Sequence, residues 1–360
     1  MTGLSLRTEA SLDRLGPEWD RLFEAGPGPQ TSRAWFVATG EAALPYGAMP
    51  QFVAVSGAEG PLLLLAMLRP GGPTWQSLTS PYTCLWEPLV RPGLSERISL
   101  KAFQLVGRHC RRYAVTRLEA LDPAWPGLPA MIGGFRAAGL ACRRFDHFAN
   151  WYATVDSGWE SYLGARPGAL RETIRRKTRA LARDAGLRIE IAASPDEIAR
   201  ALPAYEAVYA RSWKEPEPFP RFNRTVAAHL ARTGMLRMFV MWSADRPVAA
   251  QYWTVAGRSA TVLKLAHDEE EKRLSPGTVL TATAIRHLIE QDGVRELDFG
   301  RGDDPYKRSW TGERRQRVGI LVANMISWQG LAATVRHDIG RLRRAVPRIV
   351  AARSDGLSGQ

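Results

Sequence analysis

The strongest constraint on the fold is an order of segments that the sequence runs through twice. Two apolar stretches separated by a short polar turn predict an antiparallel hairpin, and each hairpin is followed by a helix and a further strand. The segments are 52–55, 61–68, 95–113 and 115–120 in the first half, and 238–242, 247–255, a helix opening at 275 and 294–299 in the second. This repeat predicts an α+β fold of two tandem modules, with mixed, mostly antiparallel sheets flanked by helices.

The length agrees with two modules, because 360 residues exceed the size at which one hydrophobic core usually keeps growing. We place a first module at residues 1–157, a basic helical connector at 158–194, a second module at 195–327, and a basic C-terminal helix and tail at 328–360. Charged, glycine-containing loops distinguish the second module. We therefore expect the chemistry there.

The formal net charge of +13 comes from three segments, and the rest of the chain is balanced. Basic residues outnumber acidic ones by seven to two over 171–188, by six to three over 301–317 and by six to one over 336–353. A basic surface that serves solubility alone is one interpretation. The other is that clustered guanidinium groups attract nucleotide phosphates, an acidic carrier protein, tRNA or an anionic membrane surface.

Several kinds of protein and site are excluded by what the sequence lacks. No apolar run approaches the roughly 18–20 residues of a membrane span, and residues 1–16 do not form a secretory signal, so we expect a cytoplasmic protein. The three cysteines, at 84, 110 and 142, have no metal-ligand spacing, so we expect reduced, packed thiols and no metal. Serine-hydrolase and P-loop motifs are also absent.

Two basic helices are predicted on either side of the second module. Residues 166–183 form a helix with a narrow apolar stripe, which either rests on the protein as a solvated helix or lies along a groove and supplies cations to a phosphate-bearing substrate. Residues 328–346 repeat apolar side chains at spacings of three and four, a pattern that Pro347 ends. This helix could dock on a membrane or a partner. We favour packing against its own second module.

The most distinctive stretch is 267–310, where a helix opens at the Ser-Pro-Gly tripeptide 275–277. A serine there is at the N-cap position, and the proline follows where φ is already helical. The free N–H groups of such a helix start, together with the helix dipole, stabilise an anion and suit a phosphate. A strand over 294–299 comes next, and then a glycine-containing charged loop that carries Asp303, Tyr306 and Lys307.

These residues resemble a known family. The segments 171–183 and 237–250, His267-Asp268, the tripeptide 275–277 and above all LDFGRGDDPYKRSW at 297–310 are similar to GNAT-superfamily acyltransferases of the cellulose-biosynthesis-associated acetyltransferase type, which are relatives of the Fem-type peptidoglycan aminoacyltransferases. The resemblance implies two GNAT-like modules, the first degenerate, and transfer of an acyl group from a thioester or ester donor to an amine. It also implies work in cell-envelope or exopolysaccharide metabolism, on a small-molecule or saccharide amine.

Acyl transfer to an amine needs a route for the amine proton, donors for the tetrahedral oxyanion and an acid for the leaving thiolate. With the resemblance as a guide, Tyr306 is the candidate acid. The candidate bases or ligands of the acceptor amine are Asp298, His267 and Asp303.

Binding residues follow from the same comparison. Strand 260–265, splayed from strand 294–299, would offer backbone N–H groups to the acyl oxyanion at Leu263 and Leu265. The residues expected to bind the donor pyrophosphate are Arg273, Ser275, Gly277 and Thr278. The candidate substrate contacts are Arg301, Lys307 and Trp213, and aromatic loops at 203–222 and 75–86 are expected to line the acceptor pocket.

Residues 273–278, which we call the donor loop, depart from the superfamily pattern Gln/Arg-x-x-Gly-x-Gly/Ala, because Pro276 and Thr278 occupy the glycine positions. Proline lacks an N–H and threonine narrows the approach of a phosphate. Acyl-CoA, with an acetyl or longer chain, and acyl carrier protein are the expected donors, and an aminoacyl-tRNA of the Fem type is the alternative. The rival hypothesis from another class is a non-catalytic module that holds a polyanion or a partner protein.

Overall fold

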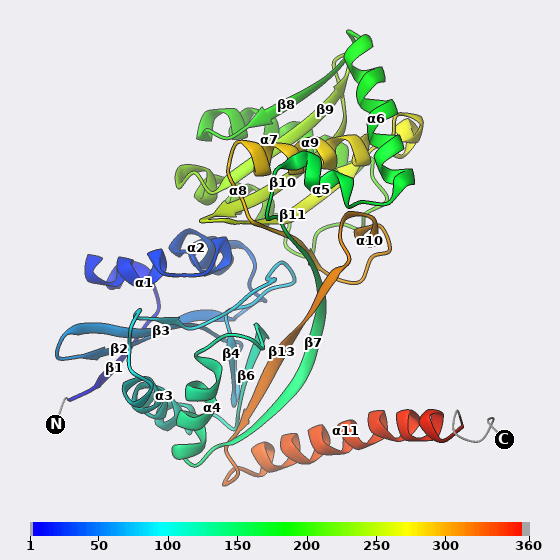
Figure 1. Cartoon of the computed structure of the whole chain (residues 1–360). Coiled ribbons are helices and arrows are strands. Elements are labelled where there is room, and N and C mark those ends of the chain that lie inside the picture. The colour runs from blue at the N-terminus through cyan, green and yellow to red at the C-terminus, as the bar shows by residue number, and fades with distance from the viewer. Residues whose placement is uncertain (1–2, 355–360) are drawn as a thin grey trace.

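The computed structural model describes residues 3–354, including the side chains of 3–341 and of Arg343 (Figure 1). The strands of the first half are β1 (Ser5–Glu9), β2 (Met49–Gly57), β3 (Gly60–Arg69), β4 (Thr74–Ser77), β5 (Leu89–Val90), β6 (Val115–Leu121) and β7 (Ala141–Thr154). Those of the second half are β8 (Leu187–Ala192), β9 (Leu236–Ser243), β10 (Arg246–Ala256), β11 (Ser259–His267), β12 (Glu296–Arg301) and β13 (Glu313–Ala323).

All of these strands belong to one sheet, whose order is β1-β2-β3-β4-β6-β13-β7-β12-β11-β10-β9-β8, with β5 added to β3. The pattern of directions is the same from both edges. Three antiparallel pairs come first on each side, and a parallel pair follows, β4 with β6 on one side and β11 with β12 on the other. The predicted fold of two similar α+β modules is confirmed by this symmetry.

The centre of the sheet is built by an exchange of strands between the modules. Strand β13, from the end of the chain, lies between β6 and β7 of the first half. Strand β7 in turn lies between β13 and β12. Both are long, and Figure 1 shows them side by side, connecting the two lobes of the molecule. Each module therefore completes its sheet with a strand from the other.

The helices cover the faces of this sheet. The first half contains α1 (Asp20–Glu24), α2 (Arg33–Ala42), α3 (Glu96–Cys110) and α4 (Leu128–Ala137). The second contains α5 (Trp159–Gly164), α6 (Gly168–Arg183), α7 (Pro195–Ala210), α8 (Phe222–Arg232), α9 (Pro276–Glu290), α10 (Lys307–Trp310) and α11 (Trp328–Ser354). Short 3-10 turns occur at Leu12–Arg14, Pro17–Trp19, Pro29–Thr31 and Glu269–Leu274.

Two of the expected elements differ in the structure. Apolar residues at helical spacing over 12–24 predict one helix, but the structure has two 3-10 turns followed by α1, because Gly16 and Pro17 interrupt the pattern. The apolar side chains of Leu12, Leu15, Trp19 and Leu22 are buried. The connector at 158–194 contains α5 and α6 but also strand β8, which forms an edge of the sheet against β9.

The C-terminal helix α11 also differs from the expectation. It continues through Pro347 to Ser354, since a proline costs a helix one hydrogen bond and a bend without forbidding it. It packs on β13, which falls within the expected second module 195–327, and also on β6 and β7 of the first half, between which β13 is inserted. An ion pair of 3.1 Å between Arg143 and Asp338 fastens it there. Within the described residues, no helix has the length and apolar character needed to cross a membrane.

One hydrophobic cluster contains buried residues of both modules, and a second lies mostly within the second module. Helices α2 and α8 pack together, with Trp35 meeting Phe222 edge to face at 5.9 Å. On the other side of Phe222, Tyr82 from the first module stacks at 3.9 Å. Burial of such large aromatic surfaces is the main favourable term in holding domains together. The two modules are therefore held in a fixed relation around the region where β11 and β12 end.

Candidate active site

A cavity of about 350 Å³ opens where β11 and β12 separate, and we call it the central cavity. The two strands pair only where Ser259–Thr261 meet Glu296–Asp298, and beyond that point residues 262–265 and 299–301 line the cavity. The opposite wall comes from the loop after β4 in the first module and the loop between α7 and α8. Both modules thus build it.

The strand β11 carries a bulge at the cavity. In its pairing with β10, Lys264 is opposite Tyr252 and Val262 is opposite Trp253, so the intervening Leu263 has no partner residue on β10. A bulge leaves the extra residue unpaired and disrupts the local hydrogen bonds. Leu263 and Leu265 both line the cavity.

Tyr306 lines the same cavity from the loop that precedes α10 and is 41% exposed. Desolvation raises the pKa of its phenol above the usual 10, and the carboxylate of Asp304 adds to the effect. The hydroxyl group therefore keeps its proton at neutral pH. It can donate that proton, or a hydrogen bond, to a group with developing negative charge.

The loop that carries Tyr306 is held by Lys307. The buried ammonium of Lys307 donates to the carbonyl of Arg301 at 2.6 Å and to that of Gly302 at 3.5 Å, and pairs with Asp304 at 2.9 Å. The N–H donors of Lys307 are therefore used within the loop that carries Tyr306. Arg301 lies against Phe148 at 4.3 Å and donates to the carbonyl of Ser80 at 3.3 Å, so it joins the loop to the first module.

Two of the candidate carboxylates are outside the lining of the central cavity. Asp298 is buried and accepts hydrogen bonds of 2.7 Å from Asn150, from the N–H of Gly300 and from Arg315. Asp303 accepts from the indole of Trp151 at 2.8 Å and is 3.3 Å from Arg314. The neighbouring Asp304 lines the cavity instead.

His267 lies between the central cavity and the start of α9. Its ring is 4.5 Å from that of Trp213, which lines the cavity, and its Nδ1 would be 3.2 Å from a methyl group added to Gly277. Burial lowers the pKa of His267 below 6.5, against an opposing effect of Glu269, so the imidazole is neutral at pH 7. Nδ1 has no hydrogen-bond partner among the described residues.

The donor loop before α9 has an unusual backbone. Ser275 occupies the N-cap position but is left-handed, with φ of 51°, and its side chain makes no capping bond, which differs from our expectation of a serine cap. Its carbonyl accepts from the N–H groups of Thr278 and Val279. The side chain of Lys177, on α6, donates to the carbonyl of Arg273. Helix α6 therefore lies directly against this loop.

A group of polar side chains at the cavity was not singled out in the sequence, although most of them come from the loops 75–86 and 203–222 that were expected to line the acceptor pocket. Glu217, between α7 and α8, accepts from the hydroxyl of Tyr82 at 2.7 Å and pairs with Lys264. Burial opposes the charge on Glu217, but hydrogen bonds from Lys264 and Tyr82 hold its pKa below the usual value. Burial also lowers the pKa values of Lys264 and Lys214, two cations of the lining. These residues lie far apart in the sequence, so no motif of fixed spacing predicts that their side chains meet.

A second cavity of about 340 Å³ is adjacent, and Cys84 lines both. Its lining includes Glu87, Asp122, Asp298 and Arg317. Burial raises the pKa of Glu87 to about 8, with Asp122 adding to the effect and Arg317 opposing it. Among the described residues, no group of histidine, cysteine and acidic side chains could hold a metal ion.

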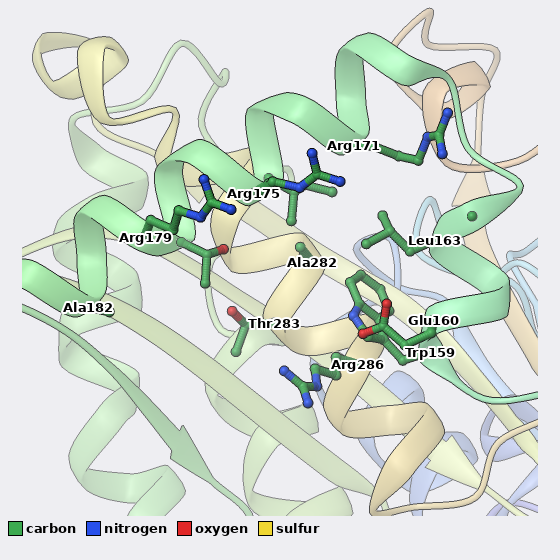
Figure 2. A pocket seen from close by; sticks show the side chains of 13 residues that line it. Trp159, Glu160, Leu163, Arg171, Arg175, Arg179, Ala182, Ala282, Thr283 and Arg286 are labelled. Atoms are coloured by element: carbon green, nitrogen blue, oxygen red, sulfur yellow. The ribbon is translucent and has the colours of Figure 1, made fainter.

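A third cavity, of about 560 Å³, lies between α5, α6 and α9, and we call it the basic groove. Arg171, Arg175 and Arg179 repeat every four residues along α6, and Arg286 on α9 faces them across the groove (Figure 2). Glu160 is the acidic residue of the lining. Within the described part of the chain, Arg171 and Arg179 form no ion pair, so the groove has free positive charge for an anion.

Comparisons with known proteins identify the fold. Residues 168–308 match the family model described as an acetyltransferase (GNAT) domain. A crystal structure of FemX is similar with a TM-score of 0.62 and 10% identity, over 88% of this chain and 96% of that one. The L-PGS of Bacillus licheniformis is similar with a TM-score of 0.53 and 12% identity, over 86% and 92% of the two chains.

A third similar structure is the C-terminal domain of a putative lysylphosphatidylglycerol synthetase from Agrobacterium fabrum. Its TM-score is 0.52 at 14% identity, over 83% of this chain and 88% of that one. A sequence search among curated proteins finds no match. The predicted GNAT fold is thus confirmed. Identities this low support the fold alone.

Proposed function

We propose that this chain of the GNAT fold is an N-acyltransferase, which passes an acyl group from a thioester to an amine by direct attack in the central cavity. The observation that carries the proposal is that the bulged strand β11, the separated strand β12 and the phenol of Tyr306 all meet in that cavity. Acyl transfer requires backbone donors for an oxyanion and an acid for the leaving group, and this arrangement supplies both.

In the proposed reaction the amine nitrogen attacks the thioester carbonyl carbon, and backbone groups near Leu263 stabilise the oxyanion. The tetrahedral intermediate then collapses with cleavage of the carbon–sulfur bond. Tyr306 donates a proton to the departing thiolate, and the proton lost by the amine passes to Asp304 or to water. Asp304 or water then returns a proton to the Tyr306 phenolate, so that both groups regain their starting state. The products are an amide and a free thiol.

For the donor we favour acyl-CoA or an acyl carrier protein, whose shared phosphopantetheine arm would enter between β11 and β12. Its phosphates would lie at the start of α9, near Gly277 and His267. His267 is neutral at that position and adds no positive charge to the phosphate site. Pro276 removes one donor there, so we expect weaker phosphate binding than a glycine-rich loop gives.

A second candidate donor, an aminoacyl-tRNA, is favoured by the basic groove. Four arginines in one groove exceed what the few phosphates of coenzyme A require, and they suit a nucleic-acid backbone. Lys177 links the helix of the groove to the donor loop. FemX and the lysylphosphatidylglycerol synthetases among the similar structures agree with this candidate. The cell-envelope or exopolysaccharide setting and a saccharide amine are further parts of the proposal, drawn from the family resemblance.

The first experiment is calorimetric titration of the protein with acetyl-CoA, longer acyl-CoAs and free CoA, at low and moderate salt. Micromolar binding that survives moderate salt supports a coenzyme A donor and leads to a screen of amines. Absence of binding to all three ligands would count against that donor, and acyl carrier protein and aminoacyl-tRNA would be titrated next.

The doubly substituted variant Arg171→Gln/Arg179→Gln separates the donor candidates. If coenzyme A is the donor, the variant should bind it within about twofold of the unsubstituted protein. If an aminoacyl-tRNA is the donor, removing two phosphate contacts should weaken binding and reduce its salt dependence. Salt-sensitive binding of a polyanion with no acyl turnover for any donor would instead favour a non-catalytic binding module.

A further inference from the structure

Helix α11 exposes its large apolar side chains. Trp328, Leu331, Val335 and Ile339 are 74%, 48%, 47% and 45% exposed. Their spacings of three and four place them along one side of the helix, and we call this row the apolar stripe. The sequence continues the same spacing with Leu342 and Val346.

The contact of α11 with the body of the protein uses a different row. Thr334 is 4% exposed, and Asp338 pairs with Arg143. A methyl group added to Gly330 would lie 2.8 Å from the carbonyl oxygen of Ala114, so this position approaches the body too closely for a side chain. Small and polar residues therefore face inward, while large apolar ones face outward. A helix that packed only on its own chain would have the opposite arrangement.

Free positive charge flanks the apolar stripe. The segment 336–353 has six arginines and one acidic residue, and that residue, Asp338, is already neutralised by Arg143. Arg336, Arg341 and Arg343 are exposed, and the described residues offer them no ion pair. An apolar row bordered by arginines is the pattern of a helix that lies in the interface of a lipid bilayer.

We propose that α11 docks this protein on an anionic lipid surface, with the apolar stripe inserted at the boundary of headgroups and acyl chains. The arginines would then bind lipid phosphates. Figure 1 shows α11 as a long rod at the margin of the molecule, where a flat surface can reach it. Charge complementarity favours this occupant over a second copy of the chain, because two such helices would bring like charges together. The proposal does not depend on the acyltransferase activity.

The test is co-sedimentation of the full-length protein with large vesicles, made either of phosphatidylcholine alone or of phosphatidylcholine and phosphatidylglycerol in equal parts. We expect binding to the anionic vesicles and at least about tenfold weaker binding to the neutral ones. The triple variant Leu331→Ser/Val335→Ser/Ile339→Ser should lose at least about tenfold in affinity for anionic vesicles.

The matched control is Tyr46→Ser/Ile191→Ser, which removes two other exposed apolar side chains and should bind like the unsubstituted protein. Equal thermal unfolding of all variants establishes that the folds are intact. The proposal is overturned if the full chain does not bind anionic vesicles, or if the triple variant binds them as well as the control. Dimerisation that the triple variant abolishes, without vesicle binding, would assign the stripe to a second copy instead.

Discussion

Asp298 acts through its hydrogen bonds, which join three strands of the centre of the sheet. Its carboxylate on β12 accepts from Asn150 on β7 and from Arg315 on β13. Burial of a carboxylate is tolerated only where partners replace the water it loses. This network fixes the end of β12, and with it the loop that carries Tyr306.

Replacing Asp298 by asparagine should lower the free energy of unfolding by about 2–4 kcal/mol, because Arg315 would lose a buried counter-charge. Urea denaturation at pH 7 measures the change. The control is Asp20→Asn, whose pair with Arg33 is half exposed and should contribute less than about 1 kcal/mol. Similar losses in the two variants would contradict the structural importance of Asp298.

Tyr306→Phe removes the phenolic proton from the central cavity while keeping the ring. If Tyr306 protonates the leaving thiolate, turnover should fall by about 100-fold, and the affinity for the donor should stay within about twofold. Steady-state kinetics and calorimetry measure the two quantities. Tyr46→Phe, at a fully exposed site, is the control. Unchanged turnover would remove Tyr306 from the mechanism.

Glu87 should make the stability of the protein depend on pH. Its folded-state pKa of about 8 is above the ordinary 4.5, so between these values the unfolded chain releases a proton that the folded one retains. Stability is therefore full below about pH 4.5 and falls as the pH rises towards 8, by up to about 1.4 kcal/mol per pH unit. Urea denaturation of Glu87→Gln at pH 5, 6.5 and 8 should show a smaller fall than the unsubstituted protein. Parallel curves for the two proteins would argue against the raised pKa.

Sequence reasoning reached part of the central cavity. The predicted site residues that line it are six: Tyr306, Arg301, Lys307, Leu263, Leu265 and Trp213. The sequence does not indicate which of Asp303 and Asp304 faces the central cavity, because neither a motif nor a periodic pattern distinguishes them. The backbone conformation of the loop places Asp304 in the lining. Residues Tyr82 and Glu217 belong to loops of different modules, which only the packed fold brings together.

At the scale of elements, the start of α9 depends on close packing against the end of β11. Gly277 is next to the ring of His267, and a methyl group there would be 3.2 Å from Nδ1. That distance is shorter than an ordinary carbon–nitrogen contact, so the ring or the helix has to shift. The donor loop and the cavity wall at Trp213 are thereby coupled through one imidazole ring.

Gly277→Ala should therefore weaken donor binding by about tenfold, while thermal stability changes little, because alanine favours the helix and offsets part of the strain. Calorimetry with the donor found in the first titration measures the affinity. Gly158→Ala, where the added methyl group meets nothing within 4 Å, is the control. Equal affinities in the two variants would mean that the phosphates bind elsewhere.

Elements with local signals were predicted well, and elements defined by distant pairing were not. The hairpins, the helix capped at Ser95 and the helix opened at Ser275 carry their signals within a few residues. Helix α7, capped at Ser194, carries such a signal too, but it was not predicted, and it includes residues 203–210 of the loop expected at 203–222. Strand β13 begins with charged residues and ends with a continuous apolar run, so it has no single period. Its position is set by β6 and β7, which lie far away in sequence.

At the scale of the molecule, the exchange of β7 and β13 makes the two modules depend on each other. Without β13, strands β6 and β7 of the first module would have no neighbour between them. Without β7, strand β12 of the second module would lose its antiparallel partner. It would also lose Asn150, the residue of β7 that donates a hydrogen bond to Asp298. Sheets with unpaired interior strands expose backbone groups that water or another chain must satisfy.

Separate expression of residues 1–157 and 158–360 should therefore give two fragments without cooperative thermal unfolding. An equimolar mixture should recover the transition of the intact chain, because each fragment supplies the strand that the other lacks. Circular dichroism during heating measures this. A fragment that unfolds cooperatively alone would contradict the interdependence of the modules.

The strand exchange also sets an order of events on the ribosome. The edge of β6 is complete once residue 121 has been made, but its neighbour β13 ends at residue 323. At the usual 5–20 residues per second, that edge waits roughly 10–40 s for its partner. Throughout this interval the nascent first module presents an open, apolar strand to solvent or to chaperones. The protein's yield in a cell should thus depend on how quickly residues 122–323 follow.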